Sequence, residues 1–435
     1  MCGSFAGICF GRGGDGLDAY GLPLIVVLFM KCFFRSFDVG IGDCNVIRLV
    51  KDDDTQYTIM VDCGSFKPAV KKYVEEVLKS HINLLVATHI DGDHIVGISK
   101  MLKTCPELKV DHIWYNCYRR HDNEQVEVEL TEEQKEVLQW IKSNLPVEFD
   151  AINYRKEISA DQGKPLAECI LENEDWNKAW EKNYITDQTP DFELCDNAVG
   201  GGNNFGKLVL LGPKPDALNI IEKKFKDAFN NYFMEIWNDS IAHSESLSEL
   251  LIRLADAKKE KFKAKTISAT VEPKMDAIFV RNAAQDEDCD SSDTNYSSIA
   301  FMLECGQHKV AMLGDAFAST LVDGIDAKYK TSDKPIICDA IKVSHHGSNG
   351  NSSKTLLGKI ASHKYFIPGG RKEDYPTWGT FGRIALSNQD GEKKMIVFSH
   401  KGIMSEKMNA LDEDVKEELK IETIITDQEY VFFEW

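Results

Sequence analysis

The chain has 435 residues, of which 43% are hydrophobic and 28% are charged, a composition typical of a folded soluble protein. Its 51 basic and 70 acidic side chains leave a formal net charge of −19, which argues against a generic polyanion-binding surface but still permits a local basic groove. This length predicts either a large α/β domain with a sizeable insertion or two domains.

The first 29 residues differ from the rest of the chain. They begin rich in glycine, and the apolar run at 22–34 is interrupted by Lys31 and is too short to span a bilayer as a helix. Neither a basic segment nor a small-residue cleavage site frames that run, so a signal peptide is not indicated. We expect residues 1–29 to be a non-core extension, favour Met30 as the translation start, and expect residues 30–435 to form the domain.

Apolar periodicity then predicts the elements of the first half in chain order. Short apolar or alternating runs predict strands, and apolar residues at helical spacing predict helices. The expected elements are strands at 31–37, 44–50 and 57–61, a helix at 66–80, a strand at 83–87, a helix at 97–102 and a strand at 112–115.

The middle of the chain is highly charged. We expect residues 119–185 and 216–290 to be helical or charged insertions, separated by a strand at 207–211. The acidic stretch 285–293 within the second insertion is predicted to be a mobile loop.

The second half is again rich in predicted strands. Together with the first half they predict an α/β fold in which two sheets pack face to face with helices outside, an αββα sandwich. The expected strands lie at 298–304, 309–313, 340–343, 365–367, 395–398, 422–425 and 430–434.

The 12 cysteines are scattered and none forms a C-x-x-C pair. This pattern argues against a structural zinc ribbon and against a disulfide framework. It favours reduced thiols in a cytoplasmic protein.

One segment concentrates metal-ligand side chains directly after a predicted buried strand. His89, Asp91, Asp93 and His94 fall within six residues. Such a cluster of acids and imidazoles is costly unless cations neutralise it. A solvated turn is the alternative for any single residue of the set, but the full pattern between a strand and a helix favours metal binding.

Two later segments end predicted strands with further ligand types. Asp315 follows one strand, and His345 and His346 follow another. Taken alone, Asp315 could cap the next helix, and either histidine could be an outer-shell donor. Beside the 89–94 cluster, metal ligation is the better interpretation.

With these motifs the chain resembles the metallo-β-lactamase fold superfamily, whose ligand motif is H-x-H-x-D-H, followed by a bridging Asp and a late His. Because Asp91 replaces the second His, it is most similar to the branch that contains the ComEC-type competence-protein hydrolase domain and its soluble relatives. Further segments resemble motifs of that branch in the same order, namely D-V-G-I-G-D at 38–43, D-C-G at 62–64, N-Y-S-S-I at 295–299, L-G-D at 313–315, S-H-H-G-S at 344–348 and T-D-Q at 426–428.

The resemblance implies two divalent metal ions. His89 and Asp91 would hold one metal, and Asp93 and His94 the other. Asp315 would bridge the two ions. His346 would complete the second site, and the carboxylate at position 91 favours manganese or magnesium, with zinc as a further option.

The resemblance also implies catalytic contacts and exposes two departures from the family. Asp93, His345 and Tyr375 are the expected catalytic residues, with His345 touching substrate or acting behind the ligands. Tyr375 stands where relatives have a histidine before proline, so Tyr375, Arg371 or Lys372 would substitute for it. The family's middle histidine ligand has no clear counterpart among His112, His121 and His243.

The expected function is therefore that of a two-metal hydrolase. The favoured form is a phosphodiesterase or nuclease that uses a metal-activated water. Expected partners are nucleic acid or another phosphodiester, and a protein partner in a multi-protein system such as bacterial defence, with no membrane insertion. The alternatives are a small-molecule hydrolase acting on a lactone, thioester or β-lactam, and a degenerate binding module without catalysis.

Overall fold

The computed structural model describes residues 30–117, 159–196, 203–220, 275–330, 334–370, 375–387, 391–426 and 428–435. The predicted extension 1–29 and large parts of both predicted insertions lie outside these residues, so the predicted domain layout stays a prediction. Four residues named above also lie outside the described ranges, namely His121, His243, Arg371 and Lys372.

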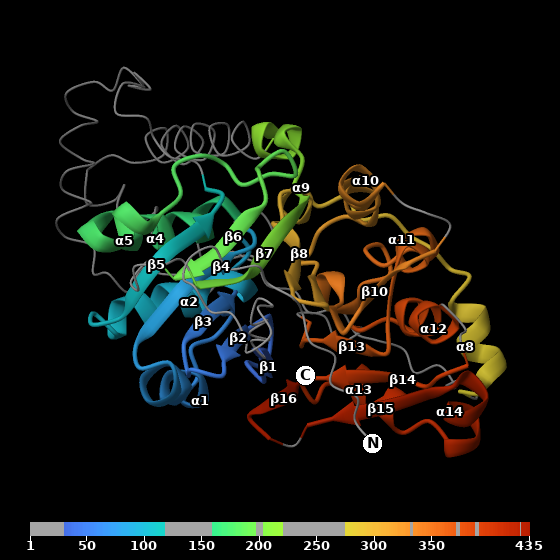
Figure 1. Cartoon of the computed structure of the whole chain (residues 1–435). Coiled ribbons are helices and arrows are strands. Elements are labelled where there is room, and N and C mark those ends of the chain that lie inside the picture. Colours follow the sequence, from blue (N-terminus) through green and yellow to red (C-terminus); the bar gives the residue numbers. More distant parts are fainter. Residues whose placement is uncertain are drawn as a thin grey trace, which may run out of the picture.

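The first sheet has six strands and mixes antiparallel with parallel pairing. The last strand of the chain returns to pair with the first, which places Phe433 opposite Phe34; Figure 1 shows this red strand beside the blue one. The strand order is β16 (Tyr430–Glu434), β1 (Met30–Phe37), β2 (Asn45–Lys51), β3 (Gln56–Val61), β4 (His81–Ala87) and β5 (Lys109–Tyr115).

The second sheet has eight strands, parallel at one end and antiparallel at the other. A short parallel pair, β10 (Ile336–Cys338) with β12 (Ile360–Ser362), lies outside it. The strand order is β15 (Ile421–Ile425), β14 (Lys394–Phe398), β13 (Lys364–Ile367), β11 (Ala340–Lys342), β9 (His308–Met312), β8 (Ala300–Cys305), β7 (Asn203–Gly212) and β6 (Phe192–Asp196).

Three apolar clusters show how the layers pack. The central cluster joins both sheets, for example through the rings of Phe34 and Phe366, whose centroids are 4.5 Å apart. The other two clusters join the outer face of each sheet to its helices. The predicted α/β fold of two mixed sheets between helical layers is therefore confirmed (Figure 1).

Helices cover both outer faces. Those packed on the first sheet are α1 (Pro68–Lys72), which continues as one π turn (Tyr73–Val77), α2 (Gly92–Thr104), α4 (Ser159–Glu172) and α5 (Glu174–Ala179). On the side of the second sheet lie α8 (Ala277–Ala283), α9 (Asp293–Tyr296), α10 (Ala318–Tyr329), α11 (Lys354–Lys359), α12 (Trp378–Leu386), α13 (Ile403–Asn409) and α14 (Glu413–Leu419).

Two further predictions meet the described residues. All ten cysteines within the described ranges are free thiols, as expected from their spacing. Within the same ranges, every helix is too short or too polar to cross a lipid bilayer.

Candidate metal centre

The residues of the candidate centre gather where strands of both sheets end. Asp62 follows β3, His89 follows β4, Asp315 follows β9, and the pair His345 and His346 follows β11. Loops after the carboxyl ends of parallel strands are where α/β sheets place their ligands. The fold therefore brings together segments that lie more than 200 residues apart in the chain.

The H-x-D-x-D-H motif straddles the start of a helix. Helix α2 begins at Gly92, earlier than the predicted start at residue 97, so Asp91 is its N-cap residue and Asp93 and His94 lie in the first turn. The motif is thus half loop and half helix. This arrangement turns side chains that are close in sequence toward a common point.

That common point is one carboxylate oxygen, Oδ2 of Asp315. The Nε2 atoms of four histidines surround it at 3.3 to 4.0 Å, and the side chain of Asp315 is only 3% exposed. The distances are 3.3 Å for His94, 3.6 Å for His346, 3.9 Å for His345 and 4.0 Å for His89.

Three of these four nitrogens lack the hydrogen-bond partner that a buried polar atom normally has. Nε2 of His89, His94 and His346 is buried and makes no well-aligned hydrogen bond. Buried polar atoms without a partner are rare, and each one needs an explanation such as a bound ion. Imidazole nitrogens that converge on a carboxylate without bonding to it fit a divalent metal ion.

The two acidic residues of the motif point to different halves of the cluster. Oδ2 of Asp91 lies 3.7 Å from Nε2 of His89, whereas Oδ2 of Asp93 lies 3.4 Å from Nε2 of His346. Donors of one ion can lie about 4.4 Å apart at most, because metal–ligand bonds to nitrogen and oxygen are about 2.0–2.2 Å long. The geometry therefore provides two neighbouring donor sets that share Asp315.

Asp62 holds the first-sheet half of the cluster in place. Its Oδ2 lies 2.8 Å from Nδ1 of His94, and its oxygens accept hydrogen bonds from the backbone and the hydroxyl of Thr88. The carboxylate behind His94 orients the ring so that Nε2 faces Asp315. From the sequence, Asp62 was assigned only to the D-C-G motif; its place directly after the apolar strand at 57–61 was the available signal.

Replacing Asp62 with Asn is expected to weaken metal binding by roughly 10–100-fold, because such outer partners fix ligand orientation and basicity. Asparagine tolerates the left-handed backbone of this residue, at φ 59°. Competition against a metal-sensitive chelator measures the effect, with Asp111→Asn as a control, since Asp111 contacts His81 at the opposite end of β4. Equal affinities for the two variants would remove Asp62 from the centre.

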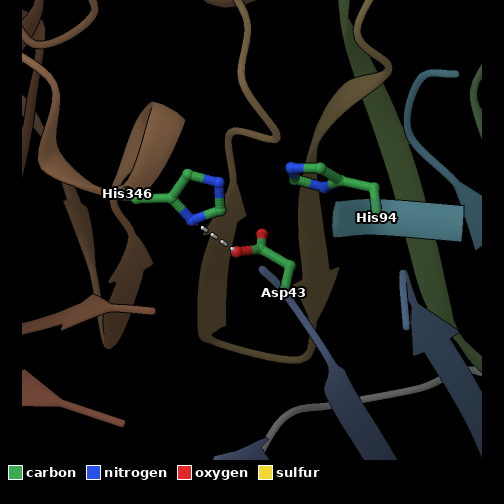
Figure 2. Close-up of side chains that lie close together, drawn as sticks. All are labelled: Asp43, His94 and His346. Carbon is green, nitrogen blue, oxygen red and sulfur yellow. Dashed lines mark ion pairs between the residues drawn. The ribbon is translucent and has the colours of Figure 1, made fainter. Parts of the chain in front are cut away.

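Asp43 and Lys342 hold the half of the centre that carries His346 in place. Nδ1 of His346 lies 3.2 Å from Oδ1 of Asp43, the ion pair drawn in Figure 2. Oδ2 of Asp43 pairs with the buried Lys342, whose ammonium donates to the carbonyl of Gly314 and lies 3.6 Å from Oδ1 of Asp315. The ammonium thus faces Oδ1 of Asp315 as an ion pair, whereas Oδ2 faces the histidines.

Asp43, His94 and His346 could by themselves hold an ion, since one donor atom from each lies within 4.8 Å of the others. Figure 2 shows the carboxylate between the two rings. Because Lys342 already neutralises Asp43, we assign this carboxylate a supporting role behind His346. Donor atoms of His89, His94 and Asp315 likewise lie within 4.8 Å of one another, and these residues belong to the cluster around Oδ2.

The acidic stretch predicted as a mobile loop supplies a third support. Oδ2 of Asp290 lies 3.3 Å from Nδ1 of His345 and accepts hydrogen bonds from Asn295 and Asn351. The buried Arg383 anchors this stretch through the carbonyl of Asp286. A functional contact therefore lies in a segment whose composition indicated only a loop.

The carboxylates of the centre are buried beside the histidines and shift the pKa values of their imidazoles. Burial alone would lower the pKa of His94, but Asp315 and Asp62 hold that pKa well above its usual value. Burial would likewise lower the pKa of His346, yet Asp315, Asp43 and Asp93 raise it to about 9. Protonated imidazoles thus take the place that metal ions would have among these carboxylates.

No protein-family model matches the chain, and no curated protein sequence matches it significantly. Among solved structures, it is similar to the metallo-beta-lactamase fold protein YhfI from Bacillus subtilis, with a TM-score of 0.33 and 10% identity over 93% of this chain and 100% of that chain.

The remaining predicted residues divide between the centre and its surroundings. The ring of Tyr375 meets His345 edge to face, with centroids 5.4 Å apart, so Tyr375 borders the centre as expected. His112, one of the histidines considered for the missing ligand, instead lies on β5 against Phe192.

A cavity of about 220 Å³ lies beside the centre. Tyr375 and Gly370 form its wall toward the histidines, because a Cβ on Gly370 would lie 3.2 Å from that of His346. The opposite wall carries His400, whose Nδ1 lies 3.0 Å from Oδ1 of Asp38. Most other lining residues are apolar or glycine, namely Ile41, Ile367, Pro368, Gly369, Pro376, Phe398, Gly402 and Ile403.

Proposed function

We propose that this chain is a two-metal hydrolase that cleaves phosphodiester bonds. The observation that carries the proposal is the convergence of four imidazole Nε2 atoms on one buried oxygen of Asp315, three of them without a hydrogen bond. A metal-dependent hydrolase accounts for this convergence, and the H-x-D-x-D-H motif supports the same assignment.

In this proposal the donors divide into two sites, in the way that the resemblance implies. His89 and Asp91 would hold the first ion. Asp93, His94 and His346 would hold the second. Asp315 would bridge both, since its Oδ2 faces the histidines and its Oδ1 faces the ammonium of Lys342.

Two divalent ions bound there would activate a water and stabilise the attacking and leaving oxygens of a phosphoryl centre. The protein's own part is to hold the donors at fixed positions through Asp62, Asp43 and Lys342. Tyr375 borders the centre through its ring contact with His345 and would position the substrate. Carboxylates at positions 91 and 93 favour a hard ion, manganese or magnesium, over zinc.

The ComEC-like motifs favour nucleic acid as the phosphodiester, within a cytoplasmic multi-protein system such as bacterial defence. The net charge of −19 weakens this form of the proposal. The cavity behind Tyr375 favours a second candidate, a small phosphodiester, because about 220 Å³ accommodates only one compact substituent.

Hydrolysis assays with manganese test the function. We expect metal-dependent cleavage of bis(4-nitrophenyl) phosphate, single-stranded DNA or double-stranded DNA, with loss of that activity in Asp93→Ala. Cleavage of the small ester alone would identify the second candidate. Absence of metal-dependent cleavage of every phosphodiester would overturn the proposal, and cleavage of a lactone or β-lactam instead would replace it.

Metal binding is expected to release protons. An ion binds the neutral imidazole, whereas the raised pKa of His94 and the pKa of about 9 for His346 keep these rings protonated in the cation-free protein. Affinity for manganese should therefore rise between about pH 6 and pH 9. Calorimetry in buffers of different ionisation enthalpy counts the released protons, and a pH-independent affinity without proton release would contradict this prediction.

A further inference from the structure

His345 occupies an unusual position in the turn after β11. It and His346 are both in the left-handed region, at φ 47° and 51°. Successive side chains in an extended strand point to opposite faces. In this turn both Nε2 atoms instead approach Oδ2 of Asp315, at 3.9 Å and 3.6 Å. Such backbone strain persists only where the surrounding structure enforces it, and it clusters at functional sites.

Nδ1, the other ring nitrogen of His345, already has polar partners. Oδ1 of Asn351 lies 3.0 Å from Nδ1, and Oδ2 of Asp290 lies 3.3 Å from it. The amide nitrogen of Asn295 lies 3.2 Å from the same atom, but it donates to Oδ2 of Asp290 at 2.6 Å. The two acceptors favour the tautomer with a proton on Nδ1, which leaves the lone pair of Nε2 facing Asp315. A carboxylate behind one ring nitrogen and an ion at the other is the usual arrangement of metal-binding histidines.

The edge-to-face ring of Tyr375 supports the imidazole of His345 from another side. The ring is therefore fixed by hydrogen-bonding groups, by an aromatic neighbour and by its backbone. A residue that only touches substrate would not need its Nε2 within 4 Å of the bridging oxygen. A ligand does, because donors of one ion lie within about 4.4 Å of each other.

The two sites are unequal without His345. The second site has three protein donors besides Asp315, whereas the first has only His89 and Asp91. We propose that Nε2 of His345 is the missing protein ligand of the first metal ion, in place of the absent middle histidine. This assignment rests on the proposed two-metal function and replaces the substrate contact that the resemblance implied for His345.

Asp290 then acquires a defined role as a positioning residue. It lies behind His345 as Asp62 lies behind His94 and Asp43 behind His346. His345, His94 and His346 thus each have their own carboxylate partner at Nδ1. The proposed ligand His345 is thus positioned by a segment, 285–293, whose sequence carries no metal-ligand motif.

Counting bound manganese tests the inference without an activity measurement. The full-length protein is loaded with manganese, passed through a desalting column and analysed by elemental analysis and electron paramagnetic resonance. We expect two ions per chain in the wild type, one in His345→Ala, and a second ion bound at least about tenfold more weakly in Asp290→Asn. The matched control is His308→Ala, which removes a histidine that contacts Asp339 at the other end of β9 and should retain two ions.

The outcomes separate the inference from the function on which it rests. Fewer than one tightly bound ion in the wild type would overturn both. Two ions of unchanged affinity in His345→Ala, together with unchanged binding in Asp290→Asn, would overturn the inference and leave the two-metal function standing. Should His345→Ala fail to fold, His345→Gln and Asp290→Asn decide the question by the same count.

Discussion

Replacing Asp315 with Asn is expected to abolish hydrolysis, by roughly a thousandfold or more, and to lower the affinity for both metal ions. Oδ2 of Asp315 approaches all four imidazoles of the centre within 4.0 Å. Removing its charge withdraws a donor from both sites, and a metal contribution of several kcal/mol corresponds to a factor of this size. Initial rates with manganese and metal counts per chain measure the two effects.

Asp339→Asn is the matched control. Asp339 precedes β11 and contacts His308 and the backbone of Lys309, at the end of the strand opposite to the centre. This variant should keep its activity and both ions. If Asp315→Asn retained two ions and near-normal rates, the histidines would not be organised around a shared bridging oxygen.

Lys342→Met is expected to lower the free energy of unfolding of the metal-free protein by about 3–5 kcal/mol, the usual result of removing one partner from a buried ion pair. The ammonium of Lys342 is 1% exposed and pairs with Asp43 and Asp315, which would be left buried without it. Urea denaturation followed by tryptophan fluorescence measures this change.

Two comparisons isolate the cause. Lys309→Met removes a lysine from the neighbouring strand β9, where it pairs with Glu304 nearer the surface, and should cost less than about 1 kcal/mol. In the double variant Lys342→Met with Asp43→Asn, part of the lost stability should return, because one unpaired charge is gone. Equal unfolding free energies for Lys342→Met and Lys309→Met would show that the buried lysine does not balance the acidic cluster.

The sequence predicted the part of the centre that is local. His89, Asp91, Asp93 and His94 lie within six residues, so strand and helix geometry alone brings them together. Asp315 was predictable because it ends an apolar strand, and strand ends meet at one edge of a sheet. The two-sheet fold followed in the same way from short apolar runs in both halves of the chain.

The supporting residues were not predictable, for physical reasons. Lysine is almost never fully buried, so nothing in the sequence distinguishes Lys342 from a surface lysine. Asp290 lies in a polar stretch whose composition indicates only a loop, and its contact with His345 spans 55 positions of the chain. The role of His345 depends on two left-handed backbone angles, which no side-chain pattern encodes.

Anomalous diffraction from crystals soaked in manganese tests the central claim most directly. Two peaks are predicted about 3.5–4 Å apart, on either side of Oδ2 of Asp315. His89, Asp91 and His345 should ligate one ion, and Asp93, His94 and His346 the other. A single peak among Asp43, His94 and His346, or no peak at all, would contradict the two-metal centre.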